Sequence, residues 1–183
     1  MSLSYAILGY LSWKPLTGYD LKKIFQDSSF MHWSGNNNQI YRTLLQLSEE
    51  ELIESELEHR ESAPSRKIYT ITLKGQEQLK DWVRSYKPEV PEMKKEILVQ
   101  LAWAGNLEQD ELDSMLCNYE EAIITHIILH KEKQQRGLYF PNRTAQETYL
   151  WDKISENMIS SYENELEWVQ TIRKDIRKEW NEI

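Results

Sequence analysis

A single cysteine, Cys117, occurs among the 183 residues, so an internal disulfide framework and the usual thiolate zinc sites are excluded. The six glycines are not clustered, which excludes a glycine-rich phosphate-binding loop. The most apolar stretch, residues 122–129, is far too short to span a bilayer, and the first residues show neither a basic leader nor a small-residue cleavage site. We therefore expect a cytoplasmic protein with no membrane role, built as one large domain or two small ones.

Negative charge is in excess, with a net charge of -8, which argues against nonspecific adhesion to nucleic acid. The excess is uneven along the chain. Residues 1–86 carry 10 Lys and Arg against 11 Asp and Glu, whereas residues 87–183 carry 12 against 19. The acidic character therefore belongs mainly to the second half.

Two prolines, Pro88 and Pro91, disfavour helix around residues 87–92, and we expect the domain boundary there. The sequence thus predicts a first domain at 1–86, a linker at 87–92 and a second domain at 93–183. A further break is expected at residues 136–144, where Gly137, Pro141 and Asn142 favour a loop between helices.

Apolar residues recur at helical spacing three times in the first half. They predict one helix that ends before Pro15, a second that Thr17 caps, and a third that begins at an asparagine among 36–38. Residues 52–58 and 67–73 then alternate as strands do, around a polar loop at 59–66. Thr72 is expected to cap a fourth helix with a stripe of Leu79, Trp82, Val83 and Tyr86. This order of elements predicts a winged helix-turn-helix.

The second half reads as wholly helical, so the fold class is mostly α, with α+β character confined to the first domain. Residues spaced by fours and threes predict a long apolar seam from Leu112 to His130: Leu112, Leu116, Tyr119, Ile123, His126 and His130. A second seam runs from Ile154 to Trp180. Exposed seams of this length would be a liability in a monomer, which favours a homodimer.

His126 and His130 lie four residues apart, a spacing at which two imidazoles can share a metal. They fall on the apolar seam and no HExxH motif accompanies them, so we interpret them as packed or partly exposed core histidines. Cys117 has no basic partner nearby in sequence and is interpreted as a buried, inert thiol. We expect no metal, no cofactor and no enzymatic activity.

Four uncharged amides, Asn36 to Gln39, stand at the start of the third helix, whose first residues enter the major groove in a helix-turn-helix. An amide carries a donor and an acceptor that match those of adenine, so Asn37, Asn38 and Gln39 are candidates for base contacts. The other candidates for DNA contacts are Tyr41, Arg42 and Tyr19 near the helix starts and Arg60, Arg66 and Lys67 in the hairpin. Each candidate has an alternative interpretation. The asparagines also suit a helix cap, and the charged residues of the hairpin also suit a solvated loop. Tyr19 also suits simple packing.

Three stretches resemble the PadR family of bacterial transcriptional regulators: residues 7–25 its opening helices, 36–47 its recognition helix around Gln39, Ile40 and Tyr41, and 65–79 its wing and following helix. The length and helical pattern of the second half are similar to those of the longer members. The resemblance implies a homodimer on a roughly palindromic operator, in double-stranded DNA, with long C-terminal helices forming the dimer. The resemblance also implies DNA contacts by the matching residues Gln39, Tyr41, Arg66 and Lys67.

The chain departs from the family pattern at two positions. Arg42 stands where the family usually has proline, and Glu51 stands where it usually has glycine before the first wing strand. Glu51 must therefore adopt the turn that glycine makes easy, or the turn must differ. Arg42 could add a phosphate or base contact.

Family members sense aromatic effectors near the boundary between domains, and Trp33, Trp82 and Trp103 are candidates for such a pocket. Core and interface packing is the alternative for these rings. The sequence thus favours a DNA-binding transcriptional regulator, and a repressor more than an activator. The competing hypothesis is a protein-interaction module that kept the winged fold and lost DNA binding, which the acidic second half supports.

Overall fold

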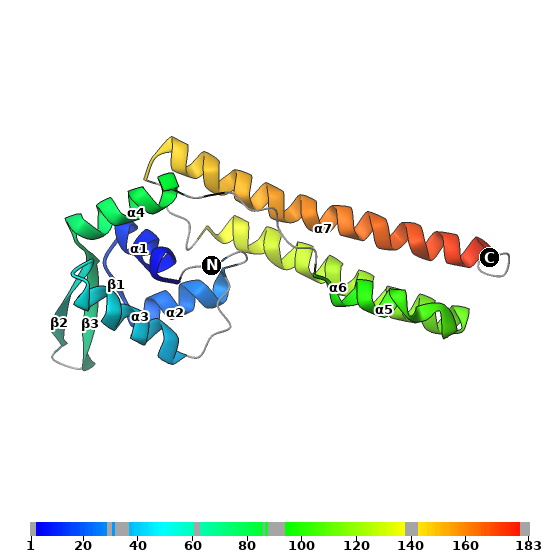
Figure 1. Cartoon of the computed structure of the whole chain (residues 1–183), viewed down its shortest axis with the longest axis horizontal. Helices are drawn as coiled ribbons and strands as arrows, with labels where there is room; N and C mark the ends of the chain where they lie inside the picture. Colours follow the sequence, from blue (N-terminus) through cyan, green and yellow to red (C-terminus); the bar gives the residue numbers. More distant parts are fainter. Residues whose placement is uncertain are drawn as a thin grey trace. The chain divides into compact units, whose positions relative to one another are not determined.

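The structure is a computed structural model that describes residues 3–28, 31, 37–60, 63–85, 87, 94–137 and 143–179. The chain divides into two units (Figure 1): Met1–Pro88 with Tyr139–Thr148, and Glu89–Leu138 with Tyr149–Ile183. The division at Pro88 falls within the proline-containing stretch, while residues 139–148 group with the first unit. Among the described helices, none combines the length and apolarity that crossing a bilayer requires.

The helices of the first unit are α1 (Leu3–Trp13), α2 (Gly18–Asp27), α3 (Asn37–Glu49) and α4 (Leu73–Ser85). As expected, α1 ends before Pro15 and α2 is capped by Thr17, whose hydroxyl accepts a bond from the Asp20 amide at 3.1 Å. The Asp20 carboxylate in turn accepts the Thr17 amide at 3.0 Å, which completes a capping box. Apolar stripes of α1, α2 and α3 form the core of this unit: Ile7, Leu8, Leu11, Leu21, Ile24, Phe25, Ile40, Leu44 and Leu47.

The wing is an antiparallel hairpin of β2 (Ile53–Arg60) and β3 (Ala63–Ile71), and a short β1 (Leu16–Thr17) joins the other edge of β3. The sequence did not predict β1, and the polar loop that it predicted at 59–66 is longer than the loop between β2 and β3. The backbones of β2 and β3 pair as far as Arg60 and Ala63, because backbone pairing does not require apolar side chains. Strand β1 pairs with β3 at Ile68 and Tyr69, four or more residues after Pro64, and a proline is best accommodated where a strand lacks a second neighbour.

The turn between α3 and β2 centres on Glu51, which has a φ of 59°. The Leu52 amide donates to the Leu47 carbonyl at 2.9 Å, and the Glu51 amide donates to the Ser48 carbonyl at 3.1 Å. This pair of bonds is the Schellman ending of a helix, with glutamate in the left-handed position that glycine usually occupies. The glycine-type turn is thus kept despite the glutamate.

Helix α4 begins after Thr72, whose hydroxyl accepts the Gly75 amide at 3.1 Å and donates to the Glu51 carbonyl at 2.8 Å. Trp82 of α4 stacks on Tyr5 of α1, with ring centroids 4.6 Å apart. The predicted buried stripe is wrong at Val83, which is 60% exposed, and holds only in part at Trp82, which stacks on Tyr5 yet is 38% exposed. Tyr86 lies outside the described residues.

The second unit contains α5 (Glu96–Ala102), η1 (Ala104–Asn106), α6 (Gln109–Arg136) and most of α7 (Ala145–Glu179). Helices α6 and α7 lie side by side (Figure 1), and they bury Leu112, Leu116, Ile123, Ile127, Val169 and Ile176. As expected in the turn after α6, Gly137 ends the helix, with a φ of 57°.

The predicted seam of α6 is wrong at His126 in that this residue is exposed, whereas the adjacent Ile127 is buried. The His126 ring stacks on that of Tyr162, with centroids 5.6 Å apart. His130 is buried, as predicted, 3.4 Å from the Ser155 hydroxyl, and burial lowers its pKa. Cys117 is half-buried and not fully buried.

Charged side chains clamp α6 to α7. The guanidinium of Arg173 donates to Asp113 at 2.9 Å and also pairs with Glu120, while Arg177 donates to Asp113 at 2.9 Å. The hydrogen bonds from Arg173 and Arg177 lower the pKa of Asp113 to about 2. A partly buried ion network thus supplements the apolar seam.

Candidate nucleic-acid interface

The residues that α3 buries in the core determine which of its other residues face outward. Ile40, Leu44 and Leu47 hold one face of the helix in the core. The side chains of Asn38, Gln39 and Arg42 are exposed, as a role in base or phosphate contact requires. Asn37 is the first residue of α3, and its side chain lies outside the described residues.

Tyr41 lies across the start of α2. A Cβ atom added to Gly18 would stand 2.5 Å from Cε1 of Tyr41, so the ring lies directly against the glycine. Tyr19, the residue after Gly18 in α2, is largely exposed. The Tyr41 ring therefore lies in the approach of α3 to α2, and the residue as a whole remains half-exposed.

On the wing, Arg66 is engaged with an acidic neighbour. Glu58 lies directly opposite Arg66 in the hairpin register and accepts bonds from its Nε and, at 3.3 Å, its Nη2. The hydrogen bond to Glu58 raises the pKa of Arg66. Lys67 points its ammonium toward the ring of Tyr69, 5.4 Å from the centroid. The side chain of Arg60 lies outside the described residues.

The start of α2 and the wing are linked electrostatically. Burial alone would raise the pKa of Asp20, but hydrogen bonds from Thr17 and the positive charges of Arg66 and Lys14 lower it. Arg66 is therefore bonded to the carboxylate of Glu58 and also feels the charge of Asp20. The predicted positive cluster of the hairpin is partly neutralised by these acids.

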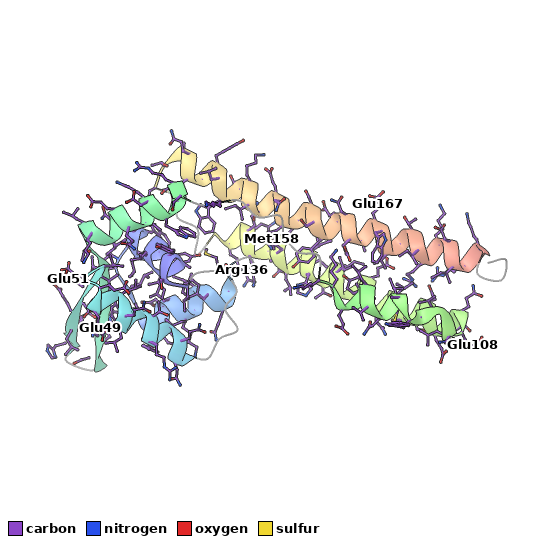
Figure 2. All side chains as sticks on the ribbon, in the orientation of Figure 1. Glu49, Glu51, Glu108, Arg136, Met158 and Glu167 are labelled. Atoms are coloured by element: carbon purple, nitrogen blue, oxygen red, sulfur yellow. The ribbon has the colours of Figure 1, made fainter. Side chains whose placement is uncertain are left out.

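The far end of α3 is acidic. Glu49, Glu50 and Glu51 are exposed. Glu49 and Glu51 are labelled in Figure 2. Lys74 donates to the Glu50 carbonyl at 2.8 Å and to the Glu51 carboxylate at 3.1 Å, which offsets part of this charge. A polyanion can thus approach α3 favourably along its first turns and not at its C-terminal end.

The residues predicted for an aromatic pocket have separate surroundings. Trp82 is stacked on Tyr5 within the first unit, whereas Trp103 belongs to the second unit and is 80% exposed. Trp33 lies outside the described residues. The aromatic pocket stays a prediction. Within the described ranges, no three His, Cys, Asp or Glu side chains are grouped as metal ligands.

Sequence reasoning missed three residues of this face. Leu45 stands seven residues after Asn38, so helical periodicity could have revealed it on the outward side. The pairing of Glu58 with Arg66 follows from the strand register, which the loosely alternating residues 52–58 did not allow us to predict. The contact between Gly18 and Tyr41 depends on how α2 crosses α3 and has no sequence signal.

Comparisons with known proteins agree with this fold. Residues 7–81 match the model of the "Transcriptional regulator PadR-like family". The "Negative transcriptional regulator PadR" of Bacillus subtilis is 30% identical over 113 residues, which are 62% of this chain and 62% of that protein's length. The matched segment thus spans less than two thirds of that regulator.

Two solved structures of Bacillus subtilis PadR, each 22% identical to this chain, share its fold. The complex with operator DNA has a TM-score of 0.82 and covers 95% of this chain and 98% of that one. The complex with p-coumaric acid has a TM-score of 0.76 and covers 96% of each chain.

Proposed function

We propose that this chain, whose residues 7–81 match the model of the PadR-like family of transcriptional regulators, is a sequence-specific DNA-binding repressor that acts as a homodimer. The observation that carries the proposal is the division of α3 into a buried apolar face and an outward face that bears Asn38, Gln39 and Arg42. A helix held in this way can enter the major groove without disturbing the core. Its site of action is the bacterial cytoplasm, where operator DNA is found.

In this mechanism, affinity and specificity come from different residues. Arg60, Arg66, Lys67, Tyr41 and Tyr19 contact phosphates and fix the register of the protein on the duplex. Base contacts are made by the amides at the start of α3 and by Arg42, through hydrogen bonds to base edges. These contacts distinguish one operator from random DNA.

A homodimer is supported by apolar side chains that remain exposed on the second unit of a single chain. Among the described residues they include Leu98, Val99, Trp103, Ile124, Ile128, Leu129, Leu150 and Ile154. Such a number of large exposed side chains favours their burial by a second copy. Two copies related by a twofold axis read a palindrome when their α3 helices are one helical turn apart, roughly 34 Å.

A small aromatic acid is the proposed class of effector. A structure of Bacillus subtilis PadR contains p-coumaric acid, and its fold covers 96% of this chain. Trp33, Trp82 and Trp103 are the proposed reporters. Titration with p-coumaric acid should quench the intrinsic tryptophan fluorescence in a saturable way. A strictly linear response would argue against this effector class.

The decisive experiment is selection of bound DNA from a random pool by the full chain, followed by sequencing. We expect enrichment of a palindrome whose half-sites lie about 10 base pairs apart, centre to centre. Absence of any enriched sequence would favour the alternative, an interaction module with a winged fold and no DNA binding.

A further inference from the structure

The outward face of α3 carries a leucine among its polar residues. Asn38, Arg42 and Leu45 follow each other at spacings of four and three, so they form one stripe along the helix. Leu45 is 60% exposed, whereas the adjacent Leu44 is fully buried. A single exposed leucine is ordinary on a protein surface. Leu45 differs because it stands in line with Asn38 and Arg42, the side chains that face the duplex in the proposed function.

We propose that Leu45 contacts the C5-methyl group of a thymine in the operator and thereby helps to determine which sequence is bound. The inference rests on the proposed function and adds a specificity-determining residue to it. In the major groove, the thymine methyl is the group that an apolar side chain can recognise. A leucine in that position removes apolar surface from water on both partners.

Charge limits the part of α3 that can approach DNA. Glu49 continues the stripe four residues after Leu45, and Glu50 and Glu51 follow it; all three are exposed. These carboxylates would be repelled by phosphates. Leu45 is therefore the last position of the stripe before the acidic end, and it lies at the edge of the surface that can contact DNA.

The helix geometry gives the position of the thymine. Asn38 and Leu45 are seven residues apart, which corresponds to roughly 10 Å along the helix. Base pairs are stacked about 3.4 Å apart, so the thymine should lie about three base pairs from the base that Asn38 contacts. The same spacing should occur in both half-sites of a palindrome.

The test uses the full chain and the sequence enriched from a random pool. Each thymine is replaced in turn by deoxyuridine, which removes the C5-methyl group alone, and dissociation constants are measured by gel shift at fixed salt. Wild type should bind roughly fourfold more weakly when the critical thymine of one half-site is replaced, the value of one buried methyl group. Leu45→Ala should bind the thymine and deoxyuridine operators equally.

Leu73→Ala is the matched control, because Leu73 is a leucine of the same unit that is 79% exposed and lies on α4. It should keep the preference of wild type for thymine. Circular dichroism should show unchanged helix content in both variants. The inference is overturned if Leu45→Ala keeps the thymine preference, if Leu73→Ala loses it equally, or if no thymine matters to wild type. Failure of the pool to enrich any sequence would overturn the proposed function, and this inference with it.

Discussion

Glu58 holds Arg66 across the wing hairpin, and its two carboxylate oxygens accept bonds from Nε and Nη2 of the same guanidinium. Both side chains are more than a third exposed, so the pair is accessible to a competing anion. A DNA phosphate presents the same acceptor geometry as a carboxylate and must compete with Glu58 for Arg66.

We therefore predict that Glu58→Gln binds operator DNA more tightly than wild type, by roughly twofold to fivefold, the range of an exposed ion pair. The released Arg66 should also make the dependence of binding on salt steeper, by up to about one phosphate contact. Gel-shift titrations at several salt concentrations measure both quantities. Arg66→Ala should flatten the salt slope more in the Glu58→Gln background than in wild type.

Glu56→Gln is the control for this prediction. Glu56 lies two residues from Glu58 on the same face of β2, opposite Ile68, so its substitution removes the same charge without releasing Arg66. Its effect on affinity should be smaller, with an unchanged salt slope. Weaker binding by Glu58→Gln would instead mean that Glu58 orients Arg66 toward the phosphate.

Glu51 occupies a left-handed conformation, with a φ of 59°, that costs a non-glycine residue about 1–2 kcal/mol. Glu51→Gly should increase the free energy of unfolding by about 0.5–1 kcal/mol, because part of the gain is offset by the greater freedom of glycine in the unfolded chain. Urea denaturation measures this difference. Glu50→Gly, one residue earlier, should instead destabilise the protein, since no positive φ is relieved there. Equal effects of the two substitutions would contradict strain at Glu51.

Gly75 allows α4 to approach the backbone before β2. A Cβ atom there would lie 2.1 Å from the Leu52 carbonyl oxygen and 2.9 Å from Cγ1 of Ile71. Gly75→Ala should therefore destabilise the protein by about 1–3 kcal/mol, the range for overpacking. Gly9→Ala is the matched control, because nothing lies within 4 Å of its added Cβ, and it should be stabilising by about 0.5–1 kcal/mol. Thermal unfolding of the two variants should shift in opposite directions.

Arg173 neutralises two carboxylates between α6 and α7, and its side chain is 14% exposed. Arg173→Met should cost about 3 kcal/mol at pH 7, because Asp113 and Glu120 lose a shared partner in a partly buried position. The pKa of Asp113 is lowered from 3.8 to about 2, so its stabilising effect is complete above about pH 4 and is lost as pH falls toward 2. The difference between wild type and variant should therefore shrink over this range.

The control is Lys131→Met, which removes an exposed pair with Glu163 between the same helices. Its cost should stay below about 1 kcal/mol at neutral pH. Urea denaturation at fixed protein concentration is required for both, since association would change the apparent stability. A penalty for Arg173→Met that does not depend on pH would contradict the ionic origin of the clamp.

Much of the fold could be predicted because its signals are local. Thr17 and Asp20 form the capping box across three residues, and the stripe of Ile40, Leu44 and Leu47 follows helical periodicity. The predicted seam of α6 was right from Leu112 to Ile123 and wrong at His126. After Ile123, a step of three residues and a step of four both fit a helical face, and only packing against α7 decides which residue is buried. The outward face of α3 could be predicted together with its buried face, because the two are opposite sides of one helix.

The sequence by itself determined the helices and the central parts of the hairpin strands, because caps and periodic apolar residues act over three or four positions. Strand β1 and the ends of β2 and β3 at the hairpin loop were decided by backbone pairing. Tertiary structure decided which side chains meet: Arg66 with Glu58, Gly18 with Tyr41, and Arg173 with Asp113 sixty residues away. These contacts depend on strand register and on the crossing of helices. Both are set by the packing of the whole core, so no short stretch of residues encodes them.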